Sequence, residues 1–122
     1  MDRLATGVDL CLDVHGDEAL PHNFIAGAES ITGWTPRLVT LQARFLSSYV
    51  GANPDSQTQH GSRSGQHDDL HPQIAQRFDC LSMTLEMPFK DNADAPDPVD
   101  GWSPARCRCL GASVLDVVHT LR

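Results

Sequence analysis

The stretch FDCLSMTLEMPF, residues 78–89, decides the fold of this chain. Its apolar residues at positions 81, 83, 85 and 87 alternate with Ser82, Thr84 and Glu86, which is the period-two pattern of a β-strand. Pro88 has no backbone N–H to donate, so we expect it to end the strand. The stretch therefore predicts a strand with one apolar face.

A second strand is predicted at residues 8–14, VDLCLDV. Valine and leucine occupy one face of this strand, while Asp9, Cys11 and Asp13 lie on the other. We expect it to stop at the polar turn HGDE, residues 15–18. Residues 23–27, NFIAG, predict a short further strand that is closed by glycine.

Two helices are predicted by the same start signal. Thr35-Pro36 and Ser103-Pro104 each combine an N-cap residue with proline at the first helical position. The first helix is expected to run to about residue 50, and both helices have apolar stripes at helical spacing. The stripes are Leu38, Leu41, Phe45, Leu46 and Tyr49 in the first helix, and Cys107, Leu110, Val114, Val117, Val118 and Leu121 in the second.

Residues 51–75 are polar and have no periodicity, so they predict a long irregular surface loop. The order of elements is then strand, short strand, helix, loop, strand and helix. This order predicts an α/β fold in which helices pack against the faces of a sheet.

Composition excludes several classes of function. The chain has 122 residues and a net charge of −7, so it suits one domain and argues against binding to nucleic acid or anionic membranes. No apolar run approaches the roughly 20 residues of a membrane helix, and the N-terminus does not match a secretory signal. We therefore expect a cytoplasmic protein whose four cysteines, which form no CxxC pair, are buried thiols.

Candidate chemistry lies at the ends of the two strongest strands. His15 follows the first strand and Glu86 lies near the end of the second, where sites gather in α/β sheets. The plainer alternatives are a hydrogen-bonded structural histidine and an exposed carboxylate. Glu18 stands at zinc-ligand spacing from His15, but Gly16 favours a turn that need not bring both to one metal. An unrelated zinc module from Cys107, Cys109, His67 and His71 also stays open.

Three stretches carry a resemblance to a known family: LDVHGDEALPHNFIAG at 12–27, WTPRL at 34–38 and RFDCLSMTLEMPFKDN at 77–92. They resemble the C-terminal half of bacterial zinc metallocarboxypeptidases, in particular the cytosolic carboxypeptidase-like branch. The resemblance covers residues 1–59 and 73–122, and residues 60–72 depart from the family pattern. It implies part of an α/β/α sandwich with a mixed sheet, in which residues 1–122 are the C-terminal portion of one peptidase domain and the N-terminal half is missing.

The resemblance also implies roles for the two strand-end residues. His15 matches the third protein ligand of the catalytic Zn²⁺, and Glu86 matches the glutamate that activates the zinc-bound water. The implied substrate is the C-terminus of a peptide or protein. The family's first two zinc ligands have no counterpart here, and Glu18 is not one of them. We therefore expect the chain alone to be inactive.

A different class of function remains as an alternative. The chain could be a catalytically inactive remnant that serves as an oligomerisation or partner-binding module. Its partner would then be a second copy of the chain or the missing N-terminal half.

Overall fold

The computed structural model describes residues 7–29, 31–56, 63–64 and 70–121. The elements follow in the order β1 (Leu10–Asp17), β2 (Phe24–Gly27), α1 (Pro36–Ala52), β3 (Arg63–Ser64), α2 (Leu70–Phe78), β4 (Leu81–Pro88) and α3 (Pro104–Thr120). Within these ranges, no helix has the length and hydropathy needed to cross a membrane.

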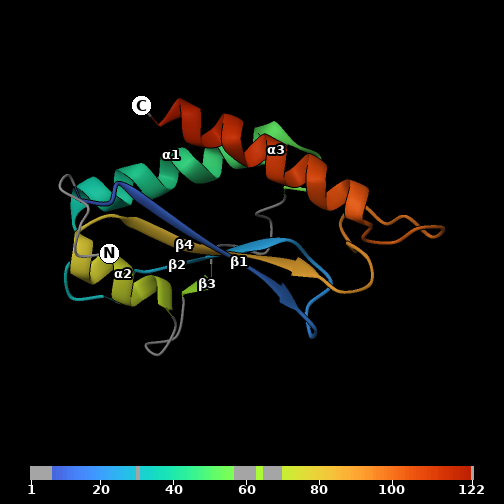
Figure 1. Ribbon diagram of the computed structural model, residues 1–122, viewed down its shortest axis with the longest axis horizontal. Coiled ribbons are helices and arrows are strands. Elements are labelled where there is room, and N and C mark those ends of the chain that lie inside the picture. Colours follow the sequence, from blue (N-terminus) through green and yellow to red (C-terminus); the bar gives the residue numbers. More distant parts are fainter. Residues whose placement is uncertain (1–6, 30, 57–62, 65–69, 122) are drawn as a thin grey trace.

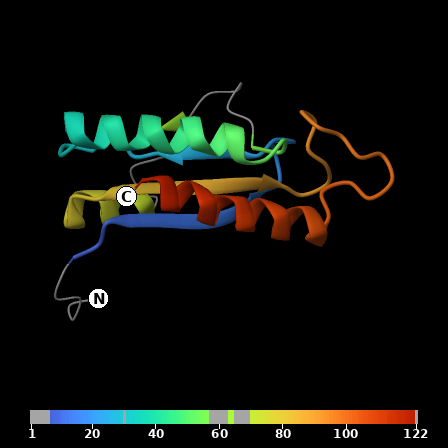
Figure 2. The ribbon, with the colours of Figure 1, turned by 90° about the horizontal axis from the view of Figure 1, so that it is seen from above.

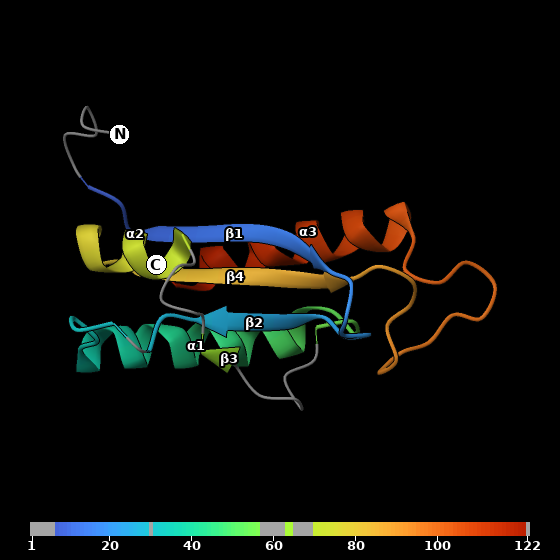
Figure 3. The same ribbon diagram turned by 90° about the horizontal axis from the view of Figure 1, so that it is seen from below.

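The strands form one mixed sheet in the order β1-β4-β2-β3. β1 pairs with β4 in parallel, β2 pairs with β4 in antiparallel and β3 pairs with β2 in parallel, as Figure 3 shows. Helices α1 and α3 cover one face of the sheet and α2 covers the other (Figure 1). The predicted α/β/α arrangement around a mixed sheet is thereby confirmed. Seen from above, α1 and α3 run side by side over the sheet (Figure 2).

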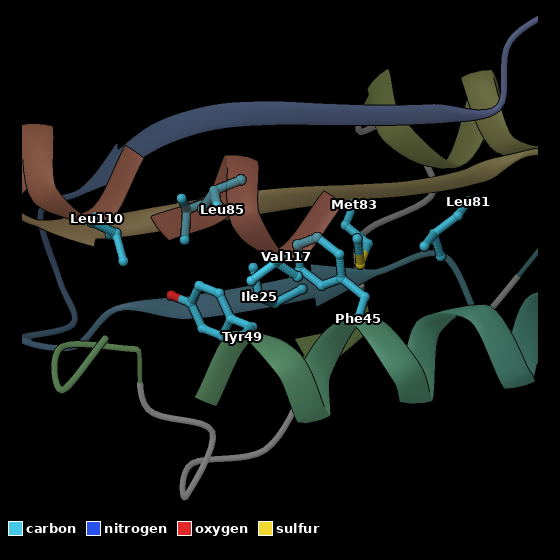
Figure 4. Packing of buried hydrophobic residues seen from close by; sticks show 9 residues of the cluster. Ile25, Phe45, Tyr49, Leu81, Met83, Leu85, Leu110 and Val117 are labelled. Atoms are coloured by element: carbon cyan, nitrogen blue, oxygen red, sulfur yellow. The ribbon is translucent and has the colours of Figure 1, made fainter. Parts of the chain in front are cut away.

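The hydrophobic core lies between the sheet and the pair α1 and α3. Period-two alternation turns Leu81, Met83 and Leu85 towards these helices, and Figure 4 shows them meeting the helical side chains. In α1 the rings of Phe45 and Tyr49 stack with centroids 6.1 Å apart. Burial raises the pKa of the Tyr49 phenol. The remaining members of this core are Ile25, Leu110, Val114 and Val117.

Both helix starts are confirmed. The Thr35 hydroxyl accepts the backbone N–H of Leu38, and the Ser103 hydroxyl accepts that of Arg106. A proline follows each cap at the start of the helix, where its missing N–H costs no hydrogen bond. The first helix extends to Ala52, two residues past the expected end.

Three predicted boundaries are wrong. β1 does not stop at residue 14 but continues to Asp17, because its parallel pairing with β4 continues through the pair Asp17 and Pro88. The expected loop at 51–75 contains β3 and the start of α2. The strand predicted from residue 78 begins at Leu81 instead, since Phe78 ends α2. Asp79 then has a φ of 50°, a left-handed conformation that belongs to a turn and not to a strand.

Arg106 on α3 ties the loop that follows β4 to the end of α1. Its guanidinium donates to the Asp55 carboxylate at 2.6 and 3.2 Å and to Asp91 at 3.1 Å. It also donates to two carbonyl oxygens of the loop and lies over the Trp102 ring, 4.9 Å from the centroid. The hydrogen bond with Asp55 is the main cause that raises the pKa of Arg106. This cluster fixes the segment that leaves the end of β4.

Gly101 turns the loop in front of α3, and we expect Gly101→Ala to destabilise the fold. Its φ is +62°, and an added Cβ would lie 2.3 Å from the Lys90 carbonyl oxygen. The strain of such a backbone position costs about 1–3 kcal/mol. Gly111 in α3 is the matched control, because a Cβ there meets nothing within 4 Å. Gly111→Ala should raise the free energy of unfolding by about 0.5–1 kcal/mol, and urea titration compares the two.

Candidate functional site

The sheet brings His15 and Glu86 side by side. The two residues are register partners on β1 and β4, and Phe24 on β2 is the next partner of Glu86. Side chains of register partners share a face of the sheet, so these three form one row across three strands. His15 Nδ1 lies 3.9 Å from Glu86 Oε1. The His15 side chain is 54% exposed and that of Glu86 is 18% exposed, so solvent reaches the pair from the histidine side.

A second row, formed by Asp13, Thr84 and Ala26, lies directly behind the first. His71 of α2 covers this row: its Nδ1 lies 2.7 Å from the Thr84 hydroxyl and its Nε2 lies 3.1 Å from the carbonyl oxygen of Gly27. The carbonyl only accepts, so Nε2 carries a hydrogen, and in a neutral ring Nδ1 accepts from the hydroxyl. The buried His71 thus holds α2 on the sheet behind the row of His15 and Glu86.

A hollow of about 430 Å³ adjoins the ends of the two strands. It is lined by residues 17–21, which begin with the last residue of β1, and by residues 88–91, which begin with the last residue of β4. The first of these turns is ordered by Asp17, whose Oδ1 accepts the backbone N–H groups of Ala19 and Leu20. On the other side, Phe89 is 64% exposed. The hollow therefore offers a mixed polar and apolar surface at the ends of β1 and β4.

The alternative zinc module built from two cysteines and two histidines is wrong. Cys107 and Cys109 belong to α3, while His71 belongs to α2 on the opposite face of the sheet (Figure 1). His67 lies outside the described residues. Across the described ranges, no three His, Cys, Asp or Glu side chains gather closely enough to hold an ion. Of the thiols predicted to be buried, Cys80 is buried, Cys11 and Cys107 are half-buried and Cys109 is exposed.

Glu18 does not join His15 either. His15 lies inside β1, whereas Glu18 is exposed beyond the end of the strand. Glu18 and His15 are therefore separated, as expected. The reason is that β1 continues past His15 to Asp17, and not that a turn begins at His15.

Two neighbours of His15 and Glu86 were missed by the sequence analysis. Phe24 flanks Glu86 through the antiparallel pairing of β2, which no local pattern reveals. Asp13 lies 2.9 Å from His15 through its Oδ2 and the ring Nε2. Its signal was present in the sequence, because residues two apart in a strand share a face. Because the strand was expected to stop at residue 14, His15 was not placed on it and its contact with Asp13 was not predicted.

The arrangement suits proton transfer next to a bound ion or water. Glu86 offers a carboxylate, and His15 offers a ring nitrogen on the same side of the sheet at a distance that a water molecule can bridge to both. The parallel strands hold both groups on a rigid backbone.

Comparison with known proteins gives relatives for almost the whole chain. No family model matches the sequence. An uncharacterized protein of Zymomonas mobilis is 41% identical over 123 residues, which cover 97% of this chain and 32% of that protein. Among solved structures, a metallo-carboxypeptidase from Burkholderia cenocepacia matches with a TM-score of 0.88 and 39% identity over 96% of this chain and 32% of that one.

A second solved structure agrees. The metallo-carboxypeptidase from Pseudomonas aeruginosa, in complex with (2-guanidinoethylmercapto)succinic acid, matches with a TM-score of 0.84 and 44% identity. The match covers 95% of this chain and 33% of that one. The chain thus spans about a third of the length of the relatives it matches. Within that third, the chain has the fold of the metallo-carboxypeptidases.

Proposed function

We propose that this chain provides the general base and one zinc ligand of a metallo-carboxypeptidase, which hydrolyses the last peptide bond of a peptide or protein. The observation that carries the proposal is the pairing of His15 with Glu86. An imidazole and a carboxylate share one row and one face of the sheet, in a fold similar to that of metallo-carboxypeptidases.

Glu86 and His15 have different roles in this proposal. Glu86 accepts a proton from the attacking water and later donates it to the leaving amine. His15 presents Nδ1 towards the same space, where a neutral imidazole nitrogen can act as a ligand. When bound, zinc supplies Lewis-acid chemistry that polarises the scissile carbonyl.

The described residues fit part of a zinc site and not a complete one. A catalytic zinc ion takes three protein ligands and keeps one open position. The described part of this chain provides the His15 imidazole with the carboxylates of Asp13 and Glu86 on either side, and these do not form a group of three donors that could hold a metal. The remaining ligands must therefore come from residues beyond the described part. The relatives have about two thirds of their length outside the matched region, which leaves room for such ligands.

A chimera tests the proposed function. This chain replaces the matching third of the Burkholderia cenocepacia metallo-carboxypeptidase, whose fold it shares. We expect the chimera to release C-terminal residues from peptides and to lose this activity in the presence of a chelator. A folded chimera that binds zinc but releases no residue from a varied peptide library would contradict the proposal.

Zinc titration of the chain alone should show no tight stoichiometric site. One ligand cannot replace the three that a catalytic zinc needs. Isothermal titration calorimetry measures the affinity, and His15→Ala identifies any contribution of the imidazole. Tight 1:1 binding that depends on His15 would mean that the chain completes its own zinc site. The proposal that this chain provides only one zinc ligand would then be wrong.

One observation favours the alternative of a partner-binding module. β1 is an edge strand of the sheet as described, and Val14 on it is 53% exposed. Beside it, an almost wholly apolar hollow of about 220 Å³ lies between the strand and α3. Unpaired edges and apolar hollows favour association with another chain. An inactive chimera, together with a chain that elutes as a stable dimer in size-exclusion chromatography, would support this alternative.

A further inference from the structure

We propose that Asp13 is a positioning residue, which fixes the His15 ring so that its unprotonated Nδ1 faces Glu86. This inference rests on the proposed function of His15 as a ligand. It concerns a carboxylate that neither the sequence analysis nor the comparisons assign to the site.

The contact follows from the geometry of β1. Asp13 and His15 are two residues apart in the strand, so their side chains leave the same face. Asp13 Oδ2 lies 2.9 Å from His15 Nε2, so the carboxylate and the ring nitrogen are in direct contact. The Asp13 side chain is only 28% exposed, so neighbouring groups restrict its movement. The ring is therefore held from one side by its own strand.

This close contact decides which nitrogen carries the proton. An ionised carboxylate only accepts, so the hydrogen of a neutral His15 must lie on Nε2. Nδ1 then keeps its lone pair and points towards Glu86. Histidines that bind metals usually donate their other ring N–H to a carboxylate or carbonyl, which fixes the tautomer and the orientation of the ring. Asp13 gives His15 this arrangement before any ion arrives.

Glu86 is the competitor for the same proton. If the hydrogen moved to Nδ1, the ring would donate to Glu86 and no longer present a lone pair to an ion. The distances decide between the two carboxylates, since Asp13 lies 2.9 Å from one nitrogen and Glu86 lies 3.9 Å from the other. The nearer carboxylate therefore determines which ring nitrogen carries the proton.

Asp17 provides a matched control on the same strand. It lies two residues after His15, as Asp13 lies two residues before it, so it shares the same face. Its Oδ1 is occupied by two backbone N–H groups. Asp17→Asn therefore removes the same charge at the same spacing along the strand without changing the partner of the His15 ring.

Nuclear magnetic resonance on the metal-free chain tests the inference directly. The chain carries ¹⁵N-labelled histidine, and His15→Ala identifies the signals of His15 in long-range ¹H–¹⁵N correlation spectra. At a pH where imidazole is neutral, we expect His15 to carry its proton on Nε2. Asp13→Asn should move the population towards the Nδ1–H form, because an asparagine amide can donate to Nε2. Asp17→Asn should leave the wild-type pattern.

Zinc affinity of the chimera provides a second readout. Loss of such a carboxylate partner typically costs 10–100-fold in metal affinity, so we expect this loss in Asp13→Asn and none in Asp17→Asn. A wild-type ring protonated on Nδ1, or an Asp13→Asn variant with the wild-type tautomer and affinity, would overturn the role of Asp13. The tautomer is measured without metal, so that result stands apart from whether the chimera is active.

Discussion

In the chimera, Glu86→Gln should lower kcat by about 10²–10⁴-fold, the usual contribution of a general base. Glutamine keeps the size of the side chain but cannot accept the proton of the attacking water at neutral pH. The neighbouring His15 remains in place, so zinc content should not change. Peptide hydrolysis followed by mass spectrometry measures the rate, and atomic absorption measures the bound zinc.

Glu18→Gln is the control for this experiment. Glu18 is a carboxylate of the same region at metal-ligand spacing from His15, but it is exposed beyond the end of β1. We expect its variant to keep full activity. If Glu86→Gln retained the activity of the parent chimera, Glu86 would have no part in the proton transfer.

Arg106→Ala should lower the free energy of unfolding by about 3 kcal/mol, the lower end of the range for breaking a buried ion pair. The Arg106 side chain is 17% exposed and that of its partner Asp55 is 12% exposed. Removing the guanidinium leaves the Asp55 carboxylate without its charge partner and frees two loop carbonyls. Urea denaturation followed by circular dichroism measures the loss.

Arg108→Ala is the matched control, because Arg108 follows Arg106 by two residues on the same helix and its side chain is exposed. We expect it to change the stability by less than about 0.5 kcal/mol. Arg106→Lys should fall between the two, since lysine keeps the charge but cannot make the bidentate contact with Asp55. Equal stabilities of Arg106→Ala and Arg108→Ala would show that the cluster does not hold the loop.

The sequence predicted the elements whose signals are local. Alternation at 81–87 identified β4 and the face on which Glu86 lies, and the pairs Thr35-Pro36 and Ser103-Pro104 marked both long helices. α2 was missed because it has only nine residues and carries Pro72, which the first turn of a helix tolerates. Its stability comes from His71 and Ala75 packing on the sheet, a tertiary effect without a strong local pattern.

The site was predicted only in part for a related reason. His15 and Glu86 were selected as strand-end residues, but their register across β1 and β4 depends on which strands pair. Strand order is not encoded in the period-two pattern of either strand. The continuation of β1 to Asp17 likewise depends on its partner, so the contact between Asp13 and His15 became visible only in the sheet.

The parallel pairing of β1 and β4 has a consequence for how the protein is made. These neighbouring strands are separated in the chain by β2, α1, β3 and α2. Contacts between such distant segments form slowly, because a long loop must close before they are gained. On the ribosome, His15 emerges well before its partner carboxylate, and the two can meet only after synthesis has passed Pro88. We therefore expect the imidazole and carboxylate to come together late in folding, so a nascent chain released early would keep one half of the pair and never acquire the other.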